Sequence, residues 1–420
     1  SAHPTISPPP SAAPSAAPSV SAAPTTSLQP TASFAPTAET TFTEHIITTE
    51  ANGVSSLAPG DLDGDGDVDT VVANRDSNTV SWWENDDNTG VWTEHVLSPS
   101  LDSPESVVLA DVDGDGDLDI VAASSGDDTV SWWENDGTGS FTYHVLTSTA
   151  DGASQVVVED VNGDGYLDVV AVSPGDDTVS WWKNVNGTGA FVEYTVTTAS
   201  DNADSVFVAD LNGDGKLDIL TGSSSEDEVN WYENGNNADE WTQESVTTSA
   251  DGVSSVYAAD LNNDTRIDII VASENADSVS WFENEDDAGT FTEHVISTSV
   301  PGPAHVVVED VNGDGRLDVV VAVTPTSLSS DASVVWFENE DNAGTFTTHE
   351  LEATTGSADT VHVVDVDGDG NMDIVVGSST DDTVWWWENN HPLSPAFTPS
   401  AAPSAHPTIS PPPSAAPSAA

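Results

Sequence analysis

The sequence contains no cysteine, so neither a disulfide framework nor a thiolate metal site can form. Lysine and arginine together number 5, against 73 aspartates and glutamates, which gives a formal net charge of −68. Nucleic-acid binding is excluded because it requires clustered Lys and Arg, and an anionic membrane surface is disfavoured for the same reason. No apolar run approaches the roughly 18 residues of a membrane span, which excludes membrane insertion.

The two ends of the chain lack charged side chains altogether. Residues 1–38 and 391–420 contain no Asp, Glu, Lys or Arg and hold 18 of the 25 prolines, in runs such as SPPPSAAPSAAP. Such segments cannot bury a core. We therefore predict Pro/Ala/Ser/Thr-rich spacers at 1–40 and 391–420, either extended as polyproline II or present as floppy linkers.

One part of these ends is duplicated. The segment SAHPTISPPPSAAPSAA at 1–17 recurs letter for letter at 404–420. This repetition suggests that the chain is one period of a longer tandem array, in which spacers alternate with folded units. The chain starts at Ser1 without a methionine or signal peptide, as expected of a processed or excerpted fragment.

The middle of the chain is built from repeats. DLDGDGDVD at 61–69 has six further relatives along the chain, at intervals of 49 to 55 residues, and we number these aspartate loops 1 to 7 in chain order. Four strand-like segments accompany each loop, for example SVVLA (106–110), LDIVAAS (118–124), VSWWEN (130–135) and FTEHVIS (291–297). Four short strands joined by turns form one antiparallel meander, so the pattern predicts an all-β, seven-bladed β-propeller over 41–390.

The order of the segments indicates how the ring closes. The fourth-strand pattern first appears as FTEHII at 42–47, before any other segment, and no such pattern follows Trp387. The N-terminal strand is therefore expected to complete the last blade and to seal its open edge. The insertion TPTSLSSDAS (324–333) should lengthen one hairpin.

The aromatic residues and histidines follow the repeat. Twelve of the 14 tryptophans lie on third strands, where adjacent side chains face opposite sides of the blade, so we expect inter-blade core rather than a sugar-stacking platform. Trp385 is an extra aromatic at its repeat position. We expect the strand histidines to be solvated or hydrogen-bonded rather than catalytic or metal-binding; they are His45, His95, His144, His294, His349, His305 and His362.

The aspartate loops follow the pattern D-x-[D/N]-G-D-G-x-x-D. Side-chain oxygens at positions 1, 3, 5 and 9, with a backbone carbonyl at 7, can surround a hard cation, and glycine at 6 permits the sharp turn. Oxygen-only ligation with several carboxylates favours calcium over zinc or copper. A merely soluble acidic turn would not explain seven copies in one register. We therefore predict up to seven Ca²⁺ sites.

The predicted ligands occupy positions 1, 3, 5, 7 and 9 of the seven loops. They are Asp61, Asp63, Asp65, Asp67 and Asp69; Asp111, Asp113, Asp115, Asp117 and Asp119; Asp160, Asn162, Asp164, Tyr166 and Asp168; Asp210, Asn212, Asp214, Lys216 and Asp218; Asp260, Asn262, Asp264, Arg266 and Asp268; Asp310, Asn312, Asp314, Arg316 and Asp318; and Asp365, Asp367, Asp369, Asn371 and Asp373.

The loop at 260–268 departs most from the pattern. Asn263 and Thr265 replace both of its glycines, and Thr adopts left-handed backbone geometry poorly, so this site is expected to be the weakest. Two glycosylation sequons also occur in the chain. Asn186, on a hairpin tip, is the predicted glycosylation site, whereas Asn263 lies within a loop and is not favoured.

These loops resemble the FG-GAP/VCBS repeat family, which includes the calcium-loop propeller of integrin α-subunit heads, fungal propeller lectins and microbial surface proteins. The resemblance covers about 350 residues and implies a seven-bladed propeller with calcium between the first and second strands of each blade. Family functions are adhesion, sugar binding and scaffolding. The SPPP, Ala-Pro and Ser-Pro runs also resemble hydroxyproline-rich glycoproteins of algal and plant extracellular matrices.

The leading hypothesis is a non-enzymatic extracellular structural glycoprotein, secreted or at a cell surface or matrix, whose calcium-stabilised propellers bind other copies in an array or filament. The alternative is a calcium-dependent carbohydrate-binding lectin or adhesin that recognises glycans. An enzyme is not expected, because a repeated loop accounts for every acidic cluster and no unique nucleophile–base set stands out.

Overall fold

The computed structural model describes residues 40–391, except 87–89, 98, 236–237, 239, 287, 325–331 and 354–356. The predicted spacers at 1–40 and 391–420 therefore lie outside the described residues except for Thr40 and His391, and so does most of the insertion at 324–333. Every helix-or-strand element in the described part is a β-strand, which confirms the all-β prediction. No described segment forms a helix long and apolar enough to cross a membrane.

Each blade contains four strands, named here from the centre of the propeller outward. The first strands are β2 (Val54–Gly60), β6 (Pro104–Ala110), β10 (Gln155–Glu159), β14 (Ala203–Ala209), β18 (Val253–Ala259), β22 (Pro303–Glu309) and β26 (Thr360–Val364). The second strands are β3 (Asp69–Asn74), β7 (Asp119–Ser124), β11 (Asp168–Ser173), β15 (Asp218–Ser223), β19 (Asp268–Ser273), β23 (Asp318–Val323) and β27 (Asp373–Ser378).

The outer half of each blade is formed by the aromatic strands and their partners. The third strands are β4 (Thr79–Asn85), β8 (Thr129–Asn135), β12 (Thr178–Asn184), β16 (Glu228–Asn234), β20 (Ser278–Asn284), β24 (Ala332–Asn339) and β28 (Thr383–Asn389). The fourth strands are β5 (Trp92–Val96), β9 (Phe141–Thr147), β13 (Phe191–Thr197), β17 (Trp241–Thr247), β21 (Phe291–Ser297), β25 (Phe346–Glu352) and β1 (Phe42–Thr48).

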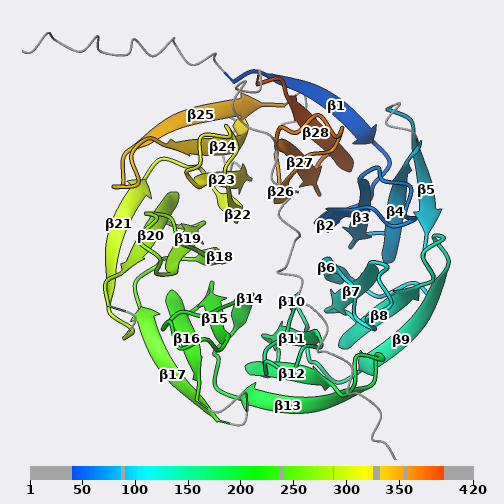
Figure 1. Ribbon diagram of the computed structural model, residues 1–420, viewed down its shortest axis with the longest axis horizontal. Coiled ribbons are helices and arrows are strands. Elements are labelled where there is room, and N and C mark those ends of the chain that lie inside the picture. The colour runs from blue at the N-terminus through cyan, green and yellow to red at the C-terminus, as the bar shows by residue number, and fades with distance from the viewer. Residues whose placement is uncertain are drawn as a thin grey trace, which may run out of the picture. The chain divides into compact units, whose positions relative to one another are not determined.

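The strands form seven four-stranded antiparallel sheets, arranged as a ring (Figure 1). Blades 1 to 6 each use four consecutive strands, from β2–β5 to β22–β25. Blade 7 combines β26, β27 and β28 with β1 from the other end of the described chain. This arrangement confirms the predicted seven-bladed propeller.

The ring is closed by β1, as the order of the segments predicted. It pairs antiparallel with β28, from Phe42 opposite Asn389 to Ile46 opposite Trp385 (Figure 1). The backbone N–H of Asn390 donates to the carbonyl of Thr41 at 2.9 Å and extends the pairing by one step. The last blade therefore presents no unpaired third strand to solvent.

The core lies between the blades. All second strands are buried along their whole length, which suits their runs of Val, Ile and Ala. The third-strand tryptophans complete these layers: Trp82 and Trp133, from neighbouring blades, pack in one cluster. Trp385 is 0% exposed, so it cannot offer a stacking face to a ligand. The prediction that the tryptophan pairs form inter-blade core is confirmed.

We predict that stability depends on the closing strand. Deleting residues 1–49 removes β1, including buried Ile47, and leaves the edge of β28 unpaired. The loss of one large buried side chain alone costs about 2–5 kcal/mol. We therefore expect a marked fall in melting temperature and self-association in size-exclusion chromatography. Deleting only residues 1–38 is the matched control and should leave both unchanged; equal behaviour of the two deletions would contradict the role of β1.

Candidate cation-binding loops

Each aspartate loop joins the first and second strands of one blade. Its sharp reversal needs left-handed backbone at positions 4 and 6, where Gly64 has φ of 75° and Gly66 has φ of 99°. Loop 5 reaches the same conformation without glycine, with φ of 59° at Asn263 and 77° at Thr265. Since a β-branched residue is strained at positive φ, loop 5 keeps the common shape at an energetic cost.

The aspartate at position 1 is held by the loop itself. In loop 1, Asp61 accepts from the N–H of Gly64 at 2.8 Å and from the N–H of Gly66 at 3.1 Å. The bond from the position-6 N–H recurs in the other six loops, with distances of 2.7–3.1 Å, at Asp111, Asp160, Asp210, Asp260, Asp310 and Asp365. The first predicted ligand is thus fixed in orientation.

The aspartate at position 9 is buried. Asp69 is 1% exposed and accepts from the N–H of Leu62 at 3.0 Å and from the N–H of Asn85 at 2.8 Å. Burial raises the pKa of its carboxyl to about 7, although the two hydrogen bonds stabilise the ionised form and so act in the opposite direction. Burial likewise raises the pKa to about 7 in Asp119, Asp168, Asp218, Asp318 and Asp373, and to about 6 in Asp268.

An asparagine ends every third strand, and in blades 2 to 7 it connects neighbouring loops. The Nδ2 of Asn135 in blade 2 donates to the carbonyl of Leu62, in loop 1, at 2.7 Å, and to that of Leu118, in its own loop, at 2.9 Å. The bond to the preceding loop recurs in blades 3 to 7, at 2.7–3.0 Å, from Asn184, Asn234, Asn284, Asn339 and Asn389. The loops therefore lie at the joints between blades.

Sequence reasoning missed these asparagines as part of the loops. The signal was present, since every third strand ends in Asn, but the residue lies 16 positions after position 9 in most blades. Only the folded arrangement brings it to the preceding loop.

Three loops bring their predicted ligands together. Carboxylate oxygens of Asp61, Asp63 and Asp69 lie within 4.8 Å of one another, and so do those of two further triads, Asp111, Asp113 and Asp115, and Asp365, Asp367 and Asp373. Two oxygens bound to one calcium at 2.3–2.6 Å can be at most about 5 Å apart. The donor sets of loops 1, 2 and 7 therefore fit a calcium ion. Loops 3 to 6 carry Asn at position 3, and their described residues form no such carboxylate triad.

The histidines of the fourth strands have partners. His95 stacks on Trp82 with ring centroids 4.5 Å apart, and its Nε2 lies 2.7 Å from Glu84 Oε2. The same Trp–His–Glu arrangement occurs at His45, His144, His294 and His349. Burial lowers the pKa of His305 to about 4 and that of His362 to about 3, which keeps both neutral at pH 7. The prediction of hydrogen-bonded or solvated strand histidines is confirmed for the five fourth-strand residues.

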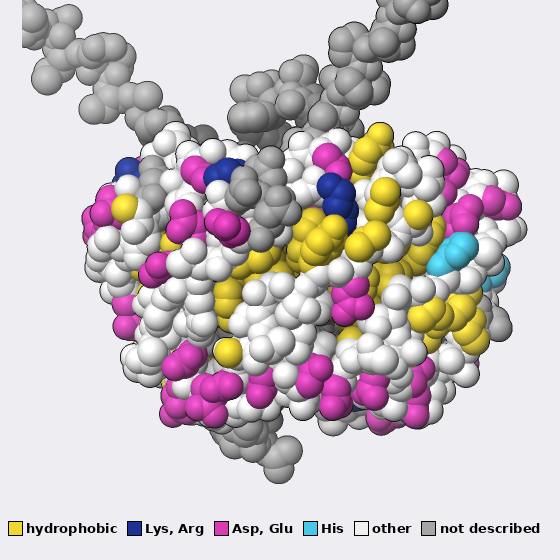
Figure 2. All heavy atoms as spheres, turned by 90° about the horizontal axis from the view of Figure 1, so that it is seen from below, with side chains coloured by type: hydrophobic (Ala, Val, Ile, Leu, Met, Phe, Trp, Pro, Cys, Tyr) yellow, Lys and Arg dark blue, Asp and Glu magenta, His cyan; other side chains and the backbone are white. Residues whose placement is uncertain are grey.

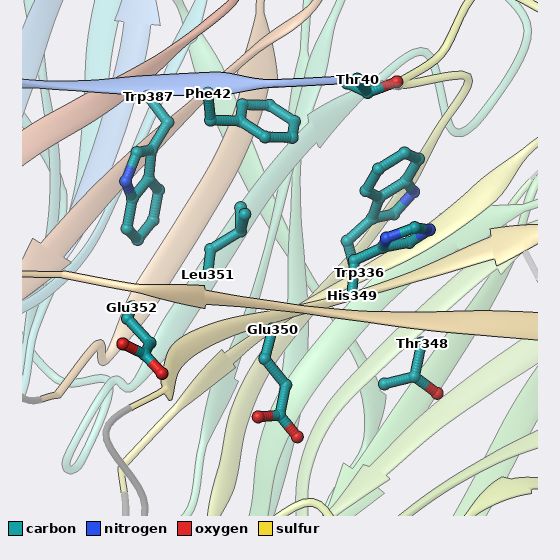
Figure 3. Close-up of a pocket in the computed structure, with 9 residues that line it drawn as sticks. All are labelled: Thr40, Phe42, Trp336, Thr348, His349, Glu350, Leu351, Glu352 and Trp387. Atoms are coloured by element: carbon teal, nitrogen blue, oxygen red, sulfur yellow. The ribbon is translucent and has the colours of Figure 1, made fainter. Parts of the chain in front are cut away.

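A cavity of about 580 Å³ lies between the outer strands of blades 6 and 7 (Figure 3). Leu351 points across it toward Phe42 and Trp387, whereas Glu350 and Glu352 point away on the opposite side of β25 (Figure 3). Trp336 and Trp387 are only 1% and 3% exposed. The two tryptophans therefore offer no open aromatic face, and neither of the two glutamates points into the cavity. Asn186, the predicted glycosylation site, is exposed in the β12–β13 turn.

Comparisons with known proteins identify the family to which this architecture belongs. A seven-bladed propeller with an aspartate loop in the first hairpin of every blade defines the class. The model of the FG-GAP-like repeat matches residues 61–122, 111–171, 160–221, 210–271, 260–321 and 321–376, and the chain belongs to this family. A comparison with curated protein sequences gave no match.

Solved structures share the fold. Virginiamycin B lyase from Staphylococcus aureus is similar with a TM-score of 0.56 at 14% identity, covering 83% of this chain and 99% of that one. A proposed 6-phosphogluconolactonase from Bacteroides uniformis has a TM-score of 0.50 at 13% identity, covering 80% and 94%. At these identities the likeness concerns the fold alone.

We predict that Asn135→Ala weakens the joint between blades 1 and 2. It removes a buried hydrogen bond to the carbonyl of Leu62 and a partly buried one to the carbonyl of Leu118, and it also removes the Oδ1 that accepts from the N–H of Gly137. Such a loss costs about 1–3 kcal/mol per unsatisfied group. Chemical denaturation should show a lower free energy of unfolding, whereas the exposed Asn52→Ala should stay within about 0.5 kcal/mol of the parent. Equal free energies of unfolding for the two variants would contradict the role of Asn135 in holding blades 1 and 2 together.

A second prediction concerns pH. The position-9 carboxyls bind protons more tightly in the folded chain than in the unfolded one, because burial raises their pKa from 3.8 to about 7, or to about 6 in Asp268. In cation-free protein this contribution is full below about pH 4 and is lost as the pH rises through 7. A bound cation would favour the ionised form. The rise in melting temperature on adding calcium should therefore be larger at pH 8 than at pH 5; a larger rise at pH 5 would contradict it.

Proposed function

We propose that this chain is a non-enzymatic structural module of the extracellular space, in which calcium stabilises the propeller and other copies of the same unit are its partners. The aspartate loops would hold up to seven Ca²⁺ ions, supplied by the roughly millimolar calcium outside cells, where modules of this kind bind with dissociation constants of about 10⁻⁴ to 10⁻³ M.

The position of the loops at the joints between blades carries this proposal. The carbonyl of Leu62 in loop 1 accepts from Asn135 of the next blade, and Asp69 of the same loop accepts from the N–H of Asn85 at the end of its own third strand. An ion bound by Asp61, Asp63 and Asp69 would therefore stiffen both a hairpin and a joint. A role in shape and stability follows more directly from this location than a role in chemistry.

Net charge supports the need for cations. The chain carries 73 acidic residues against 5 basic ones, and many acidic side chains are crowded into the loops. Two unit charges 4 Å apart near a protein surface repel by about 4 kcal/mol. Divalent cations would turn this repulsion into attraction. Without them, the loops would favour expansion of the joints.

The array is supported by the duplicated segment. Residues 1–17 and 404–420 are identical, so units joined in tandem would repeat every 403 residues. A spacer formed by residues 391–403 followed by 1–40 would reach about 160 Å in polyproline II, at roughly 3.1 Å per residue. O-linked sugars on such spacers, and an N-linked glycan at Asn186, would make the protein a glycoprotein.

We predict that calcium raises and chelation lowers the stability of the purified chain. A site at about ten times its dissociation constant adds about 1.4 kcal/mol, so several sites together should shift the melting temperature by well over 5 °C. Differential scanning calorimetry with CaCl₂, with MgCl₂ and with EDTA measures this. Asp61→Asn combined with Asp69→Asn should reduce the shift. An identical melting temperature in all three conditions would contradict the proposal that calcium stabilises the propeller.

Electron microscopy of native material tests the array. Regularly spaced beads that loosen on chelation are the expected result. Dispersed single particles, together with specific retention on a glycan array, would instead support the carbohydrate-binding alternative.

A further inference from the structure

We infer that the seven loops divide into two kinds, and that calcium is needed chiefly at blades 7, 1 and 2, where the ring is closed. Loops 3 to 6 carry a cation of their own in the form of a Lys or Arg side chain seated on the loop. This inference rests on the calcium role proposed above and specifies where that role is exerted.

The distribution of basic residues is the first observation. The sequence holds only 5 lysines and arginines, and four of them form an ion pair with the position-5 aspartate of a loop, one in each of loops 3 to 6. The pairs are Lys183–Asp164, with Nζ 2.8 Å from Oδ2, Lys216–Asp214, Arg266–Asp264 and Arg316–Asp314. The fifth, Arg75, pairs with Glu105 on a first strand.

The four cations reach the loops by two routes. In loops 4, 5 and 6 the basic residue is at position 7, whose side chain is not needed for ligation through the backbone carbonyl. In loop 3 position 7 is Tyr166, and the cation comes from Lys183 on β12, at the place where the other third strands carry Glu. Two different positions of the repeat thus place a positive charge beside the aspartate at position 5 of the loop.

The guanidinium groups are anchored on both sides. Arg266 donates through Nε to the backbone carbonyl of Asn284 while its NH2 group pairs with Asp264. Arg316 makes the equivalent bonds to Asn339 and Asp314. Each Arg therefore links its loop to the end of the third strand. This places an internal cation across the hairpin that a bound ion would also stiffen.

Loops 1, 2 and 7 have the opposite composition. Position 3 is aspartate rather than asparagine, and position 7 is Asp67, Asp117 or Asn371 rather than a basic residue or tyrosine. The carboxylate triads that converge within 4.8 Å belong to these three loops. All five basic residues of the chain are engaged elsewhere. Figure 2 shows, on the face in view, Lys and Arg at a few points along one edge of the propeller, and carboxylates along both edges.

The three loops without a built-in cation are consecutive around the ring. Blade 7 contains the junction of β1 with β28, and blades 1 and 2 follow it directly (Figure 1). Calcium bound there would act on the part of the ring that the chain closes by pairing its two ends. Blades 3 to 6 form the rest of the ring and keep an internal positive charge at every loop.

The experiment counts calcium ions on the full chain by equilibrium dialysis against CaCl₂, with the melting temperature as a second readout. We expect three tightly bound ions, matching the three triads, and binding to the other loops at least about tenfold weaker, because affinity follows the number of charged ligands.

Two exchanges between loop types sharpen the test. Asp63→Asn with Asp67→Lys gives loop 1 the pattern of loop 4; it should lower the number of tight ions to two and raise the melting temperature in EDTA. Asn212→Asp with Lys216→Asp gives loop 4 the pattern of loop 1, and it should raise the number of tightly bound ions to four. It should also lower the melting temperature in EDTA, and calcium should restore that temperature. The control Glu50→Lys changes an exposed charge outside the loops and should leave the number at three.

The outcomes separate this inference from the proposed function. Seven ions of similar affinity, or a number that neither exchange alters, would overturn the division of the loops while leaving calcium stabilisation intact. No bound calcium at all would overturn both.

Discussion

Carboxylates crowd together at the joints between blades, and much of the structure is arranged around holding them there. Each loop fixes its first aspartate with backbone N–H groups from left-handed turn positions and buries its last aspartate beside the third strand. Loops 1 to 6 are also tied to the next blade by an asparagine. These bonds orient the carboxylates but do not remove their mutual repulsion. A positive charge must do so, and the chain itself has only 5 basic side chains to offer.

The aromatic layers explain how such charged loops can be tolerated. The second strands are buried on both faces, and tryptophans of the third strands fill the wedges between blades, so an apolar cluster lies between each pair of neighbouring blades. Trp82 of this core also forms, with His95 and Glu84, one of five Trp–His–Glu arrangements that attach the fourth strand to the third. In blades 5 and 6 the glutamate also accepts from the position-3 asparagine of the loop, at 3.1 Å for Glu283 and 2.9 Å for Glu338. The outer strand and the loop are thereby linked through one side chain.

The sequence was sufficient to predict the number of blades, the four strands of each and the closing role of residues 42–47, because each depends on a local pattern repeated in register. It was not sufficient to predict contacts between blades. Asn135 and Leu62 are 73 positions apart, and their hydrogen bond depends on the angle between two sheets. The same limitation applies to Lys183, which the sequence places on a strand and the fold places against Asp164. Loop 5 shows a third kind of limit, since tertiary context holds Thr265 at a positive φ that its own preference disfavours.

Closure of a ring from one chain leaves one blade whose strands come from both ends, and the outermost strand of that blade, β1, lacks the short connection that joins the fourth strand to the third in the other blades. Loop entropy makes the pairing of β1 with β28 the least local contact in the propeller, since their residues are more than 330 positions apart. An interaction that stabilises only the folded ring has its greatest effect there, because the pairing of β1 with β28 has the largest entropic cost of formation. Internal lysines and arginines serve in blades 3 to 6, which do not contain or adjoin the β1–β28 pairing apart from blade 6. An external ion, whose binding energy is available only once the loop and its neighbour are assembled, suits the three blades at and beside the closure.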